Sequence, residues 1–433
     1  MLAFIIILLF IHMVHCDYPM AKSANNVHLY RSGSAAFTAN GTVYIHGGST
    51  IASNSNQLFS ISFDEYGFLH YQNVSDQGPA VSYHQAIVLP GNNSVVFFGG
   101  LGYSIPKNNG SQTMHAEIYS FSQNTWNTLP GMDGTTVPLH REGHTAVIAS
   151  NELIYIQGGA PGPENSNILV DSWVYNPKTL IFTNLSTPPV GLYGSSAIAL
   201  SDGRIIYIGG RYSTENNQYI SSFLLDRSMI YYTDSDIWME QELNIQAIHV
   251  INRFNDSRVH GSAVLGPDGR YIYYFGGMNG NDGNGNDLYY NNVLILDTQT
   301  WTWNAPGIPG IKPNHRCLTI GAGINNEYIL FGYDINKANT TSTGVDILKL
   351  PETKKSIGNN STELDFESLK WVYNITTGET CHQQRYPDEK LPSSITKSFI
   401  IVLEIICGIV LLALIHRTIA ILWHRRSYSI SIQ

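Results

Sequence analysis

The sequence predicts an all-β fold built from six similar repeats, followed by one membrane-spanning helix. Three observations support this prediction. A strand that ends in paired glycines recurs along the chain, hairpin-turn residues separate the strands, and helix patterns are nearly absent between two terminal apolar segments. With 433 residues and an apolar fraction of 43%, the chain is large enough to form one repeat domain with a substantial core.

The repeated unit is a short apolar strand that ends in two glycines. The first glycine stands at positions 47, 99, 158, 209, 276 and 332, and in the sixth repeat Tyr333 replaces the second one. Glycine at a strand end accepts unusual φ/ψ angles and lets a neighbouring backbone approach closely. The pattern therefore marks the same structural position in each repeat.

Each glycine pair lies between other recurring strands. A strand of small residues precedes it, such as 34–37, and a third strand and a fourth strand with an aromatic residue follow it. In the second to sixth repeats the fourth-strand aromatics are Trp126, Phe182, Trp238, Trp301 or Trp303, and Trp371. Four short strands, repeated six times, predict a six-bladed β-propeller. A seventh blade from residues 18–30 and a C-terminal strand is the alternative.

This order of strands, with its Gly-Gly and its aromatics, resembles the kelch repeat over residues 31–375. The resemblance implies a kelch-type β-propeller, which we delimit to residues 17–376. In ligand-binding kelch propellers, arginines that open the inner strands face the mouth of the central channel. The resemblance thus places four arginines on one face: Arg31, Arg141, Arg258 and Arg316.

Guanidinium groups at one mouth suit carboxylate, sulfate or phosphate groups, so an acidic peptide or a sialylated or sulfated glycan is the predicted ligand. The alternative is that these arginines bind loop carbonyls or local acids. His84 and His144 lie at the same strand starts and are further candidate ligand-binding residues. Converging imidazoles could bind a metal, but repeated strand starts gather histidines without one. We expect no metal and no other cofactor.

Catalysis finds little support in the sequence. Fungal galactose oxidase also has a kelch propeller, and such an enzyme needs Tyr and His copper ligands, a Cys crosslinked to a Tyr, and a His from a further domain. Here only Cys317 and Cys381 are available, and a short stalk follows the propeller. The sequence favours binding of a protein or glycan ligand. A membrane-tethered, kelch-type oxidase or epimerase acting on sugars is the alternative.

The two ends of the chain predict a single-pass type I membrane protein. Residues 1–16 read as a cleaved secretory signal, with an uncleaved anchor as the alternative. Residues 377–397 form a stalk, 398–418 a transmembrane helix that includes Glu404, and 419–433 a short cytoplasmic tail rich in basic residues. The propeller would then lie outside the cytosol, at the cell surface or in the secretory pathway.

The ectodomain carries sequons for N-glycosylation, all of them between the two apolar segments. They are Asn40, Asn73, Asn92, Asn109, Asn184, Asn255, Asn339, Asn359, Asn360 and Asn374. In an oxidising compartment Cys317 and Cys381 could form one disulfide. The net charge of −9 gives no reason to expect binding to nucleic acid.

Overall fold

The computed structural model describes residues 31–374 except for short internal segments. The segments outside the description are 51–52, 64–68, 103–112, 133–135, 163–166, 214–220, 246–256, 280–287, 311–312, 314–319, 325, 333–344, 352 and 356–361. The chain divides into two compact units, 1–379 and 380–433, and every described residue belongs to the first.

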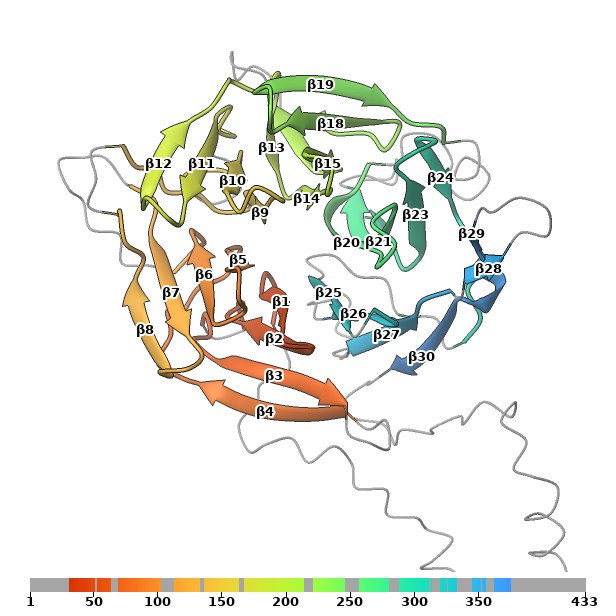
Figure 1. Cartoon of the computed structure of the whole chain (residues 1–433), viewed down its shortest axis with the longest axis horizontal. Coiled ribbons are helices and arrows are strands. Elements are labelled where there is room, and N and C mark those ends of the chain that lie inside the picture. Colours follow the sequence, from red (N-terminus) through yellow and green to blue (C-terminus); the bar gives the residue numbers. More distant parts are fainter. Residues whose placement is uncertain are drawn as a thin grey trace, which may run out of the picture. The chain divides into compact units, whose positions relative to one another are not determined.

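Six antiparallel sheets surround a central axis as the blades of a propeller (Figure 1). Blade 1 contains β1 (Ala35–Ala39), β2 (Thr42–His46), β3 (Leu58–Phe63) and β4 (Leu69–Ser75). Blade 2 contains β5 (Gln85–Val88), β6 (Ser94–Phe98), β7 (Ala116–Ser120) and β8 (Thr125–Thr128). Blade 3 contains β9 (Thr145–Ile148), β10 (Ile154–Gln157), β11 (Ser172–Asn176) and β12 (Ile181–Asn184).

The second half of the ring repeats this order. Blade 4 contains β14 (Ser196–Ala199), β15 (Arg204–Ile208), β18 (Arg227–Tyr232) and β19 (Ile237–Glu242). Blade 5 contains β20 (Val259–Leu265), β21 (Tyr271–Asn279), β23 (Val293–Asp297) and β24 (Thr302–Asn304), with β22 (Leu288–Tyr289) paired to β21. Blade 6 contains β25 (Ile320–Ile324), β26 (Tyr328–Gly332), β27 (Val345–Lys349) and β30 (Lys370–Asn374). The predicted six blades are confirmed.

Smaller elements were not predicted from the sequence. β13 (Gly191–Tyr193), β16 (Arg211–Ser213) and β17 (Ser221–Ser222) form a three-stranded sheet beside blade 4. β28 (Thr353–Lys355) pairs with β29 (Thr362–Leu364), and the 3-10 helix η1 (Phe366–Ser368) precedes β30. β16, β17, β28 and β29 arise in long connections, whereas β13 lies directly before β14, and its pairing with β16 has counterparts in blades 1 to 3 as single bridges such as that of Ser82 with Leu101.

The core lies between the blades, because the second strand of each blade has neighbours on both faces. β6 and β15 are buried at every position after the first, which explains their continuous apolar sequences. Aromatic side chains pack in the interfaces between blades. The fully buried Trp303 of blade 5 donates its indole N–H to the carbonyl of Leu225, 2.9 Å away beside blade 4.

Blades 1 and 6 close the ring by packing, since each takes its four strands from one end of the propeller sequence. Val43, Ile45 and Phe59 of blade 1 share an apolar cluster with Ile320 and Leu330 of blade 6. The Thr38 hydroxyl also donates to the Gly323 carbonyl across this interface, at 2.6 Å. Burial of apolar surface is therefore the main force that joins the first blade to the last.

In blades 1 to 4 the second glycine of the pair joins its blade to the next one by donating its N–H to a carbonyl there. In blade 3, Gly158 and Gly159 have φ angles of +66° and +82°, which L-residues rarely adopt. The Gly159 N–H donates to the Leu192 carbonyl of blade 4 at 2.8 Å, and a Cβ on Gly158 would stand 2.2 Å from the same oxygen. The sequence signal thus marks a close backbone contact between blades.

The predicted signal (1–16), stalk (377–397), transmembrane helix (398–418) and tail (419–433) lie outside the described residues. Within the part of the chain that is described, no helix is long and apolar enough to cross a membrane. The membrane topology therefore stays a prediction.

Candidate functional site

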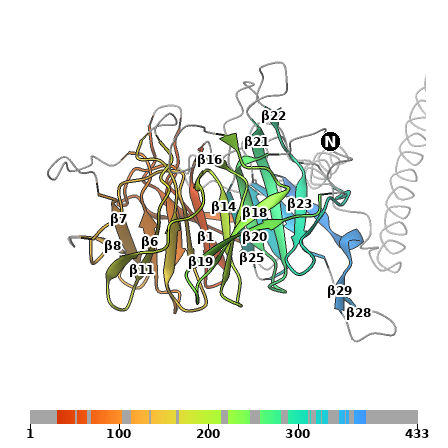
Figure 2. The same cartoon turned by 90° about the horizontal axis from the view of Figure 1, so that it is seen from above.

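The two ends of the ring carry different kinds of connection. Because the first two strands of a blade are antiparallel, the first begins where the second ends. The connections to the third strands leave from that end, which we call the loop face: 47–57, 99–115, 158–171, 209–226, 280–292 and 333–344. The opposite end, the turn face, carries tight turns at 40–41, 89–93, 149–153, 200–203 and 266–270. β16 and β22 extend to the loop face, at the top of Figure 2.

A chain of backbone hydrogen bonds runs from blade to blade around the channel at the loop face. The Tyr83 N–H donates to the Gly33 carbonyl at 2.7 Å, and the Gly143 N–H donates to the Tyr83 carbonyl at 3.1 Å. Gly194 donates in turn to Gly143 at 2.8 Å, and His260 donates to Gly194 at 2.7 Å. These five residues stand at the same place where the inner strands of blades 1 to 5 begin: the first four lie two residues before the strand, and His260 is the second residue of β20. We call this place the rim position.

Every rim position has a left-handed backbone. The φ angles are +65° at Gly33, +57° at Tyr83, +61° at Gly143, +64° at Gly194 and +58° at His260. Glycine adopts this conformation without steric cost, whereas a side-chain-bearing residue pays about 1–2 kcal/mol. Blades 2 and 5 thus hold large aromatic side chains at a position where three other blades have glycine.

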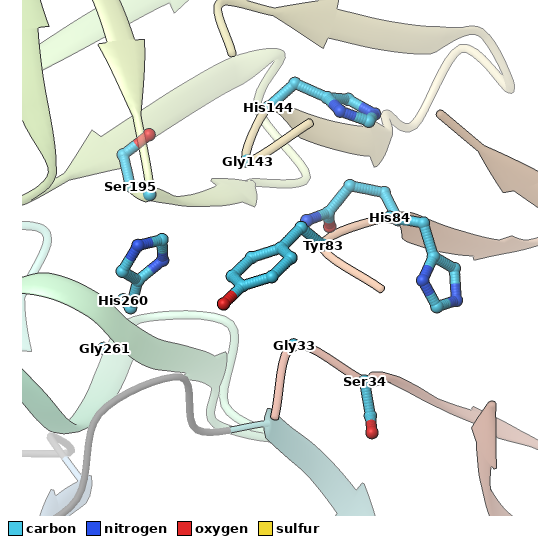
Figure 3. A pocket seen from close by; sticks show the side chains of 11 residues that line it. Gly33, Ser34, Tyr83, His84, Gly143, His144, Ser195, His260 and Gly261 are labelled. Carbon is cyan, nitrogen blue, oxygen red and sulfur yellow. The ribbon is translucent and has the colours of Figure 1, made fainter. Parts of the chain in front are cut away.

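The rim positions surround a cavity of about 90 Å³ at the channel mouth. The residues after them complete its lining: Ser34, His84, Gln85, His144, Ser195 and Gly261. In Figure 3 the rings of Tyr83 and His260 lie next to each other in this cavity, while the rings of His84 and His144 point away from them. The ring centroids of Tyr83 and His260 are 5.9 Å apart.

The cavity is polar but uncharged. No Asp, Glu, Lys or Arg is among its described lining residues. Burial lowers the pKa of His84 to about 3, and burial with the nearby Arg211 charge lowers the pKa of His260. The imidazoles are therefore neutral near pH 7, and each can both donate and accept a hydrogen bond, as serine, tyrosine and glutamine also can.

The predicted arginines lie inside the blades and not in this cavity. Arg31, Arg141 and Arg258 are all 0% exposed. Each donates to the carbonyl of the first glycine of its own blade's pair: Arg31 to Gly47 at 3.2 Å, Arg141 to Gly158 at 3.0 Å, and Arg258 to Gly276 at 3.2 Å. Each guanidinium also binds a side chain just before the third strand: Gln57, Asp171 and Asn292 respectively.

Arg141 shows the most complete set of contacts. Its two terminal nitrogens bind both oxygens of Asp171, at 2.7 and 2.8 Å, and its Nε donates to the Leu139 carbonyl at 3.0 Å. Burial alone would raise the pKa of Asp171, but the bonds from Arg141 outweigh it and lower that pKa. The backbone carbonyl of Arg141 accepts the Gly100 N–H of blade 2 at 2.9 Å. One residue thus joins two strands of its blade to the neighbouring blade.

These contacts give Arg31, Arg141 and Arg258 a structural role, which was the alternative interpretation of the sequence. The expected exposure of these arginines at the mouth was wrong, because the side chains turn toward the carbonyls at the ends of the second strands. Arg316 lies outside the described residues, and binding of an acidic ligand by these four residues stays a prediction.

His84 and His144 line the cavity, yet their rings fill the space beside the preceding blade. A Cβ on Gly47 would stand 2.7 Å from the His84 ring, and one on Gly99 would stand 2.8 Å from the His144 ring. The His84 Nε2 lies 3.0 Å from the His46 Nδ1. Among the described residues, no group of three or more His, Cys, Asp or Glu side chains is arranged to hold a metal ion.

Other predicted sites are partly described. The side chains of Asn40, Asn73, Asn92 and Asn184 are exposed. Outside the description lie Asn109, Asn255, Asn339, Asn359, Asn360, the side chain of Asn374, and both cysteines, Cys317 and Cys381. Glycosylation and the disulfide therefore remain predictions.

The sequence analysis did not identify Tyr83 or the rim position, and it counted His260 only among the histidines at the inner-strand starts. A signal was present, because aligned strand starts show Gly33, Gly143 and Gly194 at the position that these two residues occupy. Glycine in several copies of one repeat position indicates that the backbone there needs φ > 0. A large residue in the remaining copies then stands out as a candidate for function.

Six four-stranded blades around a channel, with paired glycines at the end of the second strand, define a kelch-type β-propeller. This chain belongs to the Attractin/LZTR1 beta-propeller family, whose model matches residues 15–285. A propeller of this type is consistent with a protein-binding module.

The relatives are distant. Kelch domain-containing protein 3 of Rattus norvegicus is 27% identical over 222 residues, which cover 48% of this chain and 52% of the relative. Kelch-like protein terF of Aspergillus terreus is 26% identical over 237 residues, covering 50% and 44%. The chain thus spans about half the length of the curated relatives it matches. A solved structure titled "Structure of YjhT" matches 78% of this chain and 97% of its own, with a TM-score of 0.53 and 14% identity, which supports the fold alone.

The buried histidines predict a loss of stability in acid. Burial, with the charges of Arg141, His140 and His84, holds the pKa of His144 well below its usual value. Below pH 6.5 His144 binds a proton in the unfolded chain but not in the folded chain. The contribution of His144 to the free energy of unfolding is therefore fully present above pH 6.5, and this free energy falls as the pH drops below that value.

Replacing His144 by Gln should make this fall less steep, by up to about 1.4 kcal/mol per pH unit. Urea unfolding of the full-length chain between pH 7 and pH 4.5 measures the slope. His70→Gln, which removes an exposed imidazole on β4, is the control. Equal slopes in the native chain and His144→Gln would contradict the prediction.

Proposed function

We propose that this chain is a single-pass type I membrane glycoprotein whose propeller binds a protein or glycan ligand at its loop face. The observation that carries the proposal is the difference between the two ends of the ring. All six second-to-third strand connections leave from one end, and the cavity with Tyr83 and His260 lies at the centre of the same end. Binding residues are commonly found on loops that a rigid scaffold positions.

The sequons support an extracytoplasmic propeller. Asn40 and Asn92 lie in adjacent turns of blades 1 and 2 on the turn face, and the Asn40 amide is 3.4 Å from the Asn92 carbonyl. Glycans at these two positions would cover part of the turn face, whereas Asn73 and Asn184, near the ends of β4 and β12, lie toward the loop face. The sequons Asn109 and Asn339 fall in connections that leave from the loop face, outside the described residues. Ligand binding should therefore be measured with and without enzymatic deglycosylation.

The glycosylation part of the proposal predicts a measurable loss of mass. Expressed as the full-length chain in a glycosylating host, the protein should gain gel mobility after endoglycosidase treatment. Asn40→Gln, Asn73→Gln, Asn92→Gln and Asn184→Gln should each remove one glycan, because all four side chains are exposed. Gln77→Glu, a change outside any sequon, serves as the control. Unchanged mobility of the treated native chain would refute the extracytoplasmic location.

Amide hydrogen exchange tests which face binds. The full-length chain would be screened against arrays of cell-surface proteins and of glycans, and exchange compared with and without the bound molecule. Protection is expected in the connections 47–57 and 158–171 at the loop face. Protection confined to the turns at 200–203 and 266–270 would place binding on the other end and contradict the proposal.

A further inference from the structure

Tyr83 and His260 occupy a backbone position that favours glycine. Their φ angles of +57° and +58° match those of Gly33, Gly143 and Gly194 within a few degrees, and all five share the chain of hydrogen bonds around the mouth. That chain uses only backbone atoms, so it does not require a side chain at blades 2 and 5. The aromatic groups are therefore present for a reason other than the backbone geometry.

The two side chains meet over the channel. Blades 2 and 5 face each other in a ring of six, and the rings of Tyr83 and His260 approach to 5.9 Å with a tilt of 59° (Figure 3). Each ring lies over the rim glycine of the preceding blade: a Cβ on Gly33 would stand 3.2 Å from the Tyr83 ring, and one on Gly194 would stand 2.7 Å from the His260 ring. Glycine at those neighbours makes room for the rings, and neither Tyr83 nor His260 is completely buried.

The chemistry of the cavity indicates its ligand. Its polar side chains, among them Tyr83, Gln85 and His260, can each donate and accept hydrogen bonds when neutral, and none carries a charge. Groups that also donate and accept, above all hydroxyls, match such a lining, whereas a carboxylate would find no cation on it. The ring faces add an apolar surface beside these polar groups. At about 90 Å³ the cavity is too small to enclose a whole sugar, but it is open at the channel mouth and can therefore contact one face or edge of a single sugar unit.

We propose that Tyr83 and His260 form a cross-channel binding pair for a single uncharged sugar unit, held by ring stacking and by hydroxyl hydrogen bonds at the channel mouth. The inference rests on the proposed binding function and names its ligand class. A glycan on a partner protein and a free saccharide present the same chemistry, and the probes below represent the shared sugar unit.

Saturation-transfer NMR on the full-length chain in detergent micelles tests this proposal. The probes are the methyl glycosides of galactose, glucose, mannose and N-acetylglucosamine, with N-acetylneuraminic acid as the charged comparison. At least one neutral glycoside should receive saturation from the native chain more strongly than the acid does. Tyr83→Gly and His260→Gly should each weaken its binding tenfold or more.

Because glycine fits the rim backbone, both variants should also unfold at the native temperature or above it. Leu180→Gly is the matched control, since Leu180 has φ +61° but lies in the turn between β11 and β12, so its sugar signal should stay native. Tyr83→Asn, which also tolerates this backbone, replaces Tyr83→Gly if the latter fails to fold.

Three outcomes would overturn the inference: no neutral glycoside binds, the two glycine variants bind as the native chain does, or both unfold several degrees lower. The last result would make the pair a structural plug of the channel. None of these outcomes depends on glycosylation or on which face the larger ligand protects, so a failure of the sugar site is distinguishable from a failure of the proposed function.

Discussion

Replacement of Arg141 by alanine is expected to lower the free energy of unfolding by about 3–5 kcal/mol. The substitution removes the two bonds to Asp171, the bond to the Gly158 carbonyl and the bond to the Leu139 carbonyl. It leaves a carboxylate whose side chain is only 26% exposed without its cation. Because water reaches that carboxylate in part, we expect a value near the lower end of the range.

Thermal and urea unfolding of the full-length chain would measure this loss. Arg227→Ala is the matched control, because Arg227 also binds two acids, Asp226 and Glu240, but its side chain is 42% exposed. Such exposed pairs contribute about 0–1 kcal/mol. Arg141→Lys should not restore stability, since an ammonium cannot form the two parallel bonds to Asp171. A loss below about 1 kcal/mol for Arg141→Ala would refute the structural role.

The architecture could be predicted from the sequence because its main signals are local. A glycine pair at the end of an apolar strand, a turn such as Asn40-Gly41 and a fourth-strand tryptophan are each visible within a few residues. Each signal is weak by itself, but six copies at similar spacing predict six blades. The closure between blades 1 and 6 was harder to predict, because it depends on an apolar cluster whose members, such as Ile45 and Ile320, lie far apart in the chain.

The arginines show that a correct alignment does not give the direction in which a side chain points. Repetition placed Arg31, Arg141 and Arg258 at one end of the propeller, and that placement holds. Whether a guanidinium turns to the channel or into the blade depends on the nearest acceptors. Those acceptors are main-chain carbonyls such as that of Gly158. Every residue has such a carbonyl, so the sequence does not indicate which of them an arginine will bind.

The rim residues failed to appear for a related reason. Tyr83 and His260 differ from the residues at the same position of the other repeats, whereas a repeat is defined by the residues that its copies share. Their left-handed backbone can be inferred from the sequence only because Gly33, Gly143 and Gly194 at the same repeat position indicate a positive φ. In a repeat protein, a large residue at a position that is glycine in the other repeats is therefore itself a signal for a functional site.

The contact between blades at Gly158 gives the second large expected effect. Gly158 and Gly269 have φ angles of +66° and +67°, so alanine meets the same backbone strain at both, about 1–2 kcal/mol. Their surroundings differ. A Cβ on Gly269 meets nothing within 4 Å, whereas one on Gly158 would stand 2.2 Å from the Leu192 carbonyl and 2.9 Å from the Leu192 nitrogen.

Gly158→Ala should therefore cost about 1–3 kcal/mol more than Gly269→Ala, because a backbone neighbour cannot move aside as a flexible side chain can. The displaced Leu192 carbonyl also accepts the Gly159 N–H at 2.8 Å, so the clash strains the bond that joins blade 3 to blade 4. Urea unfolding of the two variants of the full-length chain measures the difference directly, since the backbone strain cancels. Equal losses at both positions would mean that the glycine pairs serve only their own turn geometry, and that close approach between blades does not determine where they occur.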